Sequence, residues 1–270
     1  MKLGISSYTY TWAVGIHGYY PEKPMSVFEI LDKAVELGIK VVQIADNLPL
    51  DRISDAEIES IRKFTSALNI SVEVGTRGIQ DGNLLTYLDL AKRLNSSIVR
   101  VVIDTADHHP EEDEIIWIIK SVIPNFEHLG IKLAIENHDR FSAVTLEQII
   151  KKIDSEYVGI CLDTANSFGA LEGPEVVIER LGRLAINLHI KDFKVYRAEH
   201  NLGFIIEGTP AGKGMLKIPW VLQKISEYGR DPNAILELWT PPELDISETI
   251  KKEDNWAKVS IRYLRNFIKD

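Results

Sequence analysis

The sequence predicts an α/β protein, a (β/α)8 TIM barrel that forms a single domain over residues 1–270. Short apolar runs of the strand type alternate eight times with segments of helical periodicity. Eight such units in about 250 residues match the count and size of a closed barrel of parallel strands. The composition is uniform along the chain, with no linker and no low-complexity segment. A doubly wound open sheet is the structural alternative.

The first four units fill the amino-terminal half of the chain. Strands are predicted from Leu3, Lys40, Ser71 and Ile98, and the helices that follow them at residues 26–37, 55–68, 83–94 and 111–129. Ser26 is a suitable N-cap for the first helix, and a glycine or an asparagine stands where each helix should end. These stop residues are Gly38, Asn69, Asn95 and Gly130.

The carboxyl-terminal half repeats the same pattern. Its strands are the runs KLAIEN from Lys132, VGICLDT from Val158, AINLHIKD from Ala185 and AILELW from Ala234, and its helices are predicted at residues 145–153, 174–181, 217–228 and 250–268. Parallel strands joined by right-handed helical crossovers place all their carboxyl ends at one face of a barrel. That face is where a catalytic site is expected.

Two connections are longer than a strand-to-helix loop requires. One runs from Tyr8 to Met25 and is rich in aromatic residues, and the other runs from Phe193 to Met215 and contains four glycines. Both follow strands, so both should lie on the catalytic face, where they could form the walls and the lid of a site.

Charge and composition narrow the class of protein. The chain is 45% hydrophobic and has a formal net charge of -9, which argues against binding to nucleic-acid phosphate or to an anionic membrane. Its single cysteine, Cys161, cannot form an intrachain disulfide. The amino terminus is too short and too polar for a signal peptide, and no apolar run reaches the ~18 residues of a membrane span. We therefore expect a soluble, cytoplasmic protein.

Four successive strands end in residues that can hold a metal ion. They are Glu136, Asp163, His189 and Glu237. Three buried carboxylates placed close together repel one another unless a cation neutralises them. A set of three carboxylates and one histidine, without a thiolate, favours Mn²⁺, Mg²⁺ or Co²⁺ over a structural zinc, although Zn²⁺ can also bind such a site. The simpler alternative is a set of salt-bridged charges at the barrel mouth.

Short motifs at these strand ends resemble a known family. I-E-N-H ends at His138, L-D-T-A-N begins at Leu162, H-I-K-D begins at His189, G-x-G spans Gly212 to Gly214, and L-E-L surrounds Glu237. Together they resemble the xylose isomerase-like TIM barrels, a superfamily of sugar and sugar-phosphate isomerases and epimerases that also holds endonuclease IV-type DNA repair enzymes. The resemblance implies that the four strand-end residues are metal ligands. It also implies that Glu136 and Glu237 act as the acid/base pair.

Further side chains are candidates for substrate binding. Strand alternation aims His138 and Lys191 at the same mouth, and Arg197 in the second long connection could clamp a substrate oxyanion. Asn166 stands where part of the family has a histidine, and an amide can bind a sugar hydroxyl but is a poor metal ligand. Glu73 and Trp12 are weaker candidates. The alternatives to a role in substrate binding are that these residues are surface or loop side chains, form salt bridges, or pack in the ordinary way.

The expected function is that of a divalent-metal-dependent isomerase or epimerase of a ketose, a keto-sugar derivative or its phosphate. The metal would stabilise an enediolate while one glutamate removes a proton and the other returns it on the opposite face. A lyase or decarboxylase of a keto sugar acid could use the same site. An endonuclease IV-like hydrolase and a non-catalytic sugar-binding barrel are weaker alternatives. We expect a small-molecule carbohydrate substrate and neither nucleic acid nor membrane as partner, and homo-oligomer formation is left open.

Overall fold

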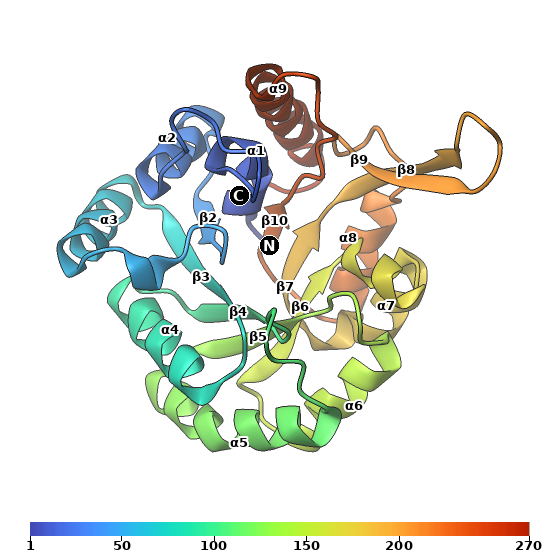
Figure 1. The fold of residues 1–270 in the computed structure, drawn as a ribbon. Coiled ribbons are helices and arrows are strands. Elements are labelled where there is room, and N and C mark those ends of the chain that lie inside the picture. The colour runs from blue at the N-terminus through green and yellow to red at the C-terminus, as the bar shows by residue number, and fades with distance from the viewer. Residues whose placement is uncertain (270) are drawn as a thin grey trace.

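The computed structural model describes residues 1–269 and shows the predicted closed barrel (Figure 1). Its eight parallel strands close in the order β1-β10-β7-β6-β5-β4-β3-β2. They are β1 (Leu3–Ser6), β2 (Val41–Ile44), β3 (Ser71–Arg77), β4 (Ile98–Val102), β5 (Lys132–Glu136), β6 (Val158–Asp163), β7 (Ala185–Ile190) and β10 (Ala234–Leu236). The open-sheet alternative is thereby excluded.

A ring of helices surrounds the strands (Figure 1). Its members are α2 (Val27–Leu37), α3 (Asp55–Leu68), α4 (Asp81–Arg93), α5 (Glu112–Leu129), α6 (Ala143–Ile153), α7 (Pro174–Leu181), α8 (Ile218–Glu227) and α9 (Ile246–Leu264). Ser26 caps α2 in a capping box with Glu29, and Gly38 and Asn69 end α2 and α3 in left-handed conformation. The capping residues therefore set these boundaries as the sequence predicts.

Three helices have boundaries that differ from the sequence prediction by two to four residues. Helix α4 begins at Asp81, α6 begins at Ala143, and α9 runs from Ile246 to Leu264. The side chains of Ser142 and Asp245 accept hydrogen bonds from Thr145 N and Ser247 N, so these caps start α6 and α9 earlier than the sequence predicts. Apolar periodicity places the start of α9 too late because the first turn of this helix is largely polar.

The apolar core is the layer between the strands and the helices, where most buried apolar side chains form one continuous cluster. The barrel interior is different, because many of its buried side chains are polar. These are Gln43, Glu73, Arg100, Glu136, Cys161, Asp163, Asn187 and His189. They come from successive strands, and the interior is thus a polar network that leads up to the mouth of the barrel.

The two long connections contain secondary structure that the sequence analysis did not predict. The first holds the 3-10 helix η1 (Ser7–Tyr10), the one-turn helix α1 (Thr11–Val14) and a bridge between Ile16 and Tyr19. The second is an antiparallel hairpin of β8 (Asp192–Arg197) and β9 (Phe204–Thr209), which projects from the barrel in Figure 1. Shorter 3-10 turns occur at Leu50–Arg52 (η2), Asn166–Ala170 (η3) and Gly182–Leu184 (η4).

The base of the hairpin is fixed to the barrel by one carboxylate. Asp192 Oδ1 accepts hydrogen bonds from Phe193 N and Leu216 N, and Oδ2 accepts from Gly212 N and Gly214 N. The G-x-G motif therefore serves as a turn that donates its amides to Asp192. Within residues 1–269, no helix has the length and apolar character needed to cross a membrane.

Candidate active site

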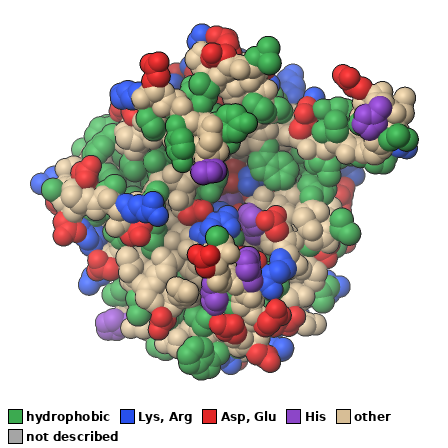
Figure 2. Space-filling view, viewed as in Figure 1, with side chains coloured by type: hydrophobic (Ala, Val, Ile, Leu, Met, Phe, Trp, Pro, Cys, Tyr) green, Lys and Arg blue, Asp and Glu red, His purple; other side chains and the backbone are tan. Residues whose placement is uncertain are grey.

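A pocket of about 650 Å³ opens at the carboxyl-terminal face of the barrel. Figure 2 shows it as the hollow at the centre of this face, with charged side chains at its floor. The floor carries Arg100, Glu136, Lys191 and Glu237, and the wall is largely aromatic and aliphatic. A charged floor beneath an apolar wall is suited to a small polar ligand that is shielded from water.

The four strand-end residues converge around His189, and two of them, Glu136 and Glu237, line the pocket. His189 Nδ1 lies 3.4 Å from Glu136 Oε2, 3.6 Å from Asp163 Oδ2 and 3.5 Å from Glu237 Oε1. Glu136 and Asp163 are the last residues of β5 and β6, His189 is the penultimate residue of β7, and Glu237 follows β10 directly. The closed barrel brings these four ends together, although 101 positions separate the first of them from the last in the chain.

Glu136, Asp163, His189 and Glu237 form an acidic cup, and its geometry fits a divalent metal ion. Within residues 1–269, Asp163 Oδ2, His189 Nδ1 and both Glu237 oxygens are buried and lack a hydrogen-bond partner. The ligand atoms of Asp163, His189 and Glu237 lie within 4.8 Å of one another. Buried polar atoms without partners are costly, and one cation would satisfy all of them at once. The donor set is rich in hard oxygen, as Mn²⁺ and Mg²⁺ prefer.

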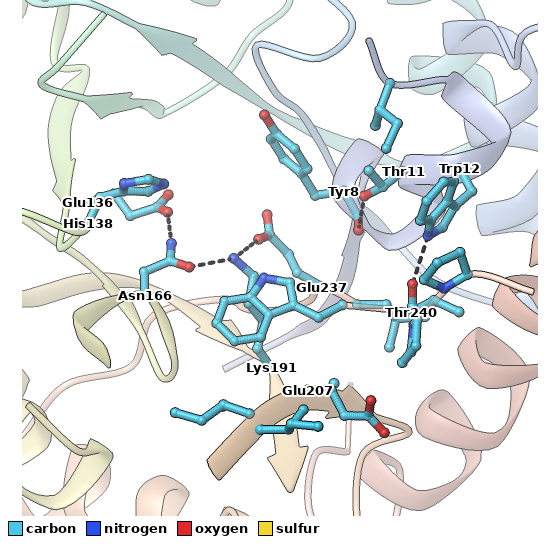
Figure 3. A pocket seen from close by; sticks show the side chains of 18 of the residues that line it. Tyr8, Thr11, Trp12, Glu136, His138, Asn166, Lys191, Glu207, Glu237 and Thr240 are labelled. Atoms are coloured by element: carbon cyan, nitrogen blue, oxygen red, sulfur yellow. Dashed lines mark hydrogen bonds and ion pairs between the residues drawn. The ribbon is translucent and has the colours of Figure 1, made fainter. Parts of the chain in front are cut away.

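Lys191 and Asn166 link the carboxylates of the cup (Figure 3). Lys191 Nζ lies 2.9 Å from Asp163 Oδ2 and 2.9 Å from Glu237 Oε2, in ion pairs not aligned as hydrogen bonds. It donates to Asn166 Oδ1 at 3.1 Å, and Asn166 Nδ2 donates to Glu136 Oε1 at 2.7 Å. Burial lowers the pKa of Lys191, but Asp163 and Glu237 outweigh burial and hold it above its usual value. The amine is therefore kept as an ammonium ion.

Arg100 is a second buried cation, and the sequence analysis missed it. Its Nε donates to Glu136 Oε2, and its Nη1 donates to Asp46 Oδ1 at 2.7 Å. Arg77 Nε donates to the other Asp46 oxygen at 3.0 Å. Burial raises the pKa of Asp46, but Arg100 and Arg77 outweigh it and hold the pKa at about 2. An arginine inside the apolar run IVRVV was the available signal, because a charge there must point into the barrel.

Aromatic residues form the wall above the floor. The Trp239 ring lies 5.6 Å from Lys191 Nζ, and Tyr8 donates its hydroxyl to Asp46 Oδ2 at 3.1 Å. Trp12 Nε1 donates to Thr240 O at 2.8 Å, which fixes the indole at the rim. Trp12 and His138, two of the residues predicted to bind substrate, both line the pocket.

Two sequence candidates lie elsewhere. Glu73 is buried beneath the cup, where its carboxylate accepts hydrogen bonds from Gln43, Asn187 and Asn233, so it does not line the pocket. Arg197 lies at the far end of β8 with its guanidinium 4.3 Å from the Phe204 ring. Glu73 lies in the middle of β3 and not at its end. Arg197 was expected on a loop over the site, whereas this part of the connection is the projecting hairpin.

The fold and the acidic cup define a (β/α)8 barrel with a candidate metal centre at its catalytic face. Residues 31–267 match the family model described as xylose isomerase-like TIM barrel, and the chain belongs to this family. The resemblance identified from the sequence is thereby confirmed. Family membership does not by itself specify a reaction.

One sequence relative and two solved structures are similar to this chain. A protein of Pectobacterium atrosepticum named 3-oxo-isoapionate decarboxylase is 34% identical over 264 residues, which cover 98% of this chain and 95% of that protein. D-psicose 3-epimerase from Clostridium cellulolyticum H10, solved with D-tagatose, superposes with a TM-score of 0.74 at 16% identity and full coverage of both chains. A xylose isomerase-like protein from Mycobacterium smegmatis, in complex with magnesium, gives a TM-score of 0.68 at 16% identity, with 97% of each chain covered.

Proposed function

We propose that this protein is a metal-dependent decarboxylase of a 3-oxo sugar acid. The observation that carries this proposal is the asymmetry of the two glutamates at the pocket floor. Glu136 accepts hydrogen bonds on both oxygens, from Arg100 and from Asn166. Neither oxygen of Glu237 accepts a hydrogen bond from within residues 1–269. Both oxygens of Glu136 are therefore occupied by partners, whereas the oxygens of Glu237 remain open to a metal ion or a substrate.

This asymmetry suits decarboxylation better than epimerisation. Epimerisation needs one group to remove a proton and a second to return it on the opposite face, so both glutamates must change protonation state. Decarboxylation removes carbon dioxide instead of a proton and needs only one proton in return. The relative with 34% identity carries the name of a decarboxylase of a 3-oxo acid, which supports the same choice.

Glu136, Asp163, His189 and Glu237 would hold the metal ion, and Mn²⁺ is our first choice, with Mg²⁺, Co²⁺ and Zn²⁺ as alternatives. When bound, the ion would act as a Lewis acid that stabilises negative charge on the ketone oxygen. In a 3-oxo acid the ketone is β to the carboxylate, so the electron pair of the breaking carbon–carbon bond moves toward that oxygen. Carbon dioxide leaves, and an enolate remains that must gain one proton.

The residues of the chain bind the acid and supply this proton. Arg77 and Lys191 line the pocket and provide positive charge for the substrate carboxylate. Glu237 is the group placed to deliver a proton to carbon, because it lines the pocket and neither of its oxygens accepts a hydrogen bond from within residues 1–269. Lys191 Nζ, 2.9 Å from Glu237 Oε2, keeps a positive charge beside this carboxyl group, and solvent supplies the proton that each turnover consumes. Trp12 and Trp239 limit access of water from above.

The test is a comparison of substrates in deuterated water. Metal-loaded protein is incubated with 3-oxo-isoapionate, with other 3-oxo sugar acids and with simple ketoses, and carbon dioxide and deuterium incorporation are measured. We expect carbon dioxide from a 3-oxo acid, one deuterium in each product molecule, and no exchange into the ketoses. Exchange into a ketose without release of carbon dioxide would overturn the proposal.

That second result would favour the epimerase or isomerase that the sequence first suggested. The observation in its favour is that Glu136 and Glu237 both line the pocket, as an acid/base pair on two sides of a substrate must. For this reaction Glu136 would have to release Asn166 or Arg100 during turnover. The fate of carbon dioxide therefore distinguishes the two functions directly.

A further inference from the structure

Beneath the candidate metal ligands lies a second layer of buried polar side chains that the proposed function does not use. It consists of Gln43, Glu73, Cys161 and Asn187, all less than 5% exposed, together with Asn233. We propose that Gln43, oriented by Glu73 and Asn187, is a positioning residue that fixes the ring of His189 so that Nδ1 presents its lone pair to the metal site. This inference rests on the metal site of the proposed function.

Glu73 determines how the amides of this layer are turned. Its Oε2 accepts hydrogen bonds from Gln43 Nε2 at 3.1 Å and from Asn187 Nδ2 at 2.8 Å, and its Oε1 accepts from Asn233 Nδ2 at 2.7 Å. A carboxylate only accepts hydrogen bonds, so each amide must turn its nitrogen toward it. No lysine, arginine or histidine among residues 1–269 forms an ion pair with Glu73, and the three amides are its partners.

Asn187, which Glu73 also orients, gives a second constraint on Gln43. With Asn187 Nδ2 directed at Glu73, its Oδ1 points to Gln43 Nε2 at 3.0 Å and to Cys161 Sγ at 3.3 Å. Gln43 Nε2 therefore has two acceptors, Glu73 and Asn187. A flipped Gln43 amide would place its oxygen against both of these acceptors, which the network does not allow.

The orientation of Gln43 then decides which nitrogen of His189 carries hydrogen. Gln43 Oε1 lies 2.8 Å from His189 Nε2, and because an amide oxygen only accepts, Nε2 must be the donor. In the neutral ring the lone pair is then on Nδ1. Nδ1 is the atom that lies 3.4 to 3.6 Å from the three carboxylates of the cup. A hydrogen-bonded partner on the distal nitrogen is how proteins orient a histidine ligand.

The test uses changes of equal size that alter only hydrogen-bonding character. Gln43→Met removes the acceptor, and Glu73→Gln removes the carboxylate that orients Gln43. The double variant Gln43→Glu, Glu73→Gln restores an acceptor for His189 and a donor beside it. Thr65→Val, which removes a buried hydrogen bond to Ile61 O in α3, is the control for loss of stability alone.

Two quantities are measured on each protein: the affinity for Mn²⁺ and Zn²⁺ by competition with a chelator, and the ring N–H resonances of ¹⁵N-labelled histidine. The His189 resonance is assigned by its absence in His189→Gln. We expect affinity to fall about 10- to 100-fold in each single variant, with recovery in the double variant and no change in Thr65→Val. The His189 Nε2–H resonance should shift in Gln43→Met and stay in place in the control.

Unchanged affinity in both single variants, or an unchanged His189 resonance in Gln43→Met, would overturn the inference. If the wild-type protein binds neither metal, the proposed function fails instead. In that case the ring resonance, measured on the same samples without metal, still decides whether Gln43 orients His189. The two failures are therefore distinguishable.

Discussion

Replacing Arg100 by methionine tests whether ion pairing holds the buried charges at the barrel mouth. Arg100 is 2% exposed and binds both Glu136 and Asp46. Methionine keeps an unbranched, apolar chain but removes the charge, so the buried Glu136 and the partly buried Asp46 each lose a partner. Breaking a buried pair in this way costs about 3–5 kcal/mol of the free energy of unfolding. Since each kcal/mol shifts Tm by about 2–4 °C in a chain of this size, Tm should fall by about 6–20 °C.

The loss of stability in Arg100→Met should depend on pH, and the lowered pKa of Asp46 determines whether it grows or shrinks as the pH falls. Its pKa of about 2 in the folded protein lies below the value of about 3.9 in an unfolded chain. An acid with a lowered pKa stabilises the fold above its unfolded value, and this contribution is lost as the pH falls through its folded value. The variant lacks the guanidinium that lowers this pKa. The difference between the two proteins should therefore be largest at neutral pH and shrink below about pH 4.

The control is Arg140→Met, which breaks an ion pair at the surface. Arg140 binds Asp104 through two hydrogen bonds of 3.0 and 2.7 Å, and its side chain is 33% exposed. Surface pairs contribute about 0–1 kcal/mol, so its Tm should change little. Thermal and urea transitions of both variants and of the wild-type protein are measured from pH 8 down to about pH 2. A loss in Arg100→Met no larger than in Arg140→Met, or one that is constant with pH, would refute the reasoning.

Three further changes test the site and its support. Glu237→Gln should lower kcat for carbon dioxide release by about 100- to 10,000-fold, because the proton donor is lost, and a variant of full activity would exclude that role. Addition of Mn²⁺ at 100 times its Kd should stabilise the wild-type protein by about 2.7 kcal/mol but not His189→Gln, as followed by thermal denaturation; equal shifts in both would count against the cup. Glu253 of α9 accepts hydrogen bonds from the backbone N–H groups of Trp12 and Ala13, and burial raises its pKa to about 8. Because this pKa is raised on folding, the contribution of Glu253 is complete below about pH 4 and is lost as the pH rises through 8, so the urea midpoint of the wild-type protein relative to Glu253→Gln should fall between pH 5 and pH 9. A difference that does not vary with pH would contradict this.

The barrel could be predicted from the sequence because each strand is a short apolar run and most helices have clear stop residues. Gly38, Asn69 and Gly130 adopt the left-handed conformation that ends a helix, as their residue types indicate. The β8–β9 hairpin was missed because its strands are half exposed and lack a continuous apolar run. The glycine-rich composition of that connection suggested an irregular loop and concealed the alternation of DFKVYR.

Of the candidate site, only the residues at the strand ends could be predicted from the sequence, and not the buried polar residues beneath them. Position at a strand end and residue type were enough to place Glu136 beside His189, because every strand of a parallel barrel ends at the same face. Arg100 and Gln43 lie within apolar runs, whose residues are expected to pack in the core and not to take part in a functional site. Their partners are far away in the chain, so only the closed barrel shows that they face the ligands.

The central claim, a decarboxylase that depends on one divalent ion, is tested most directly by titrating metal-free protein with Mn²⁺ while carbon dioxide release from a 3-oxo sugar acid is followed. We predict negligible release without metal, a linear rise and a break at about one ion per chain. Asp163→Asn should require much more metal for the same activity. Full carbon dioxide release by the metal-free protein would contradict the claim.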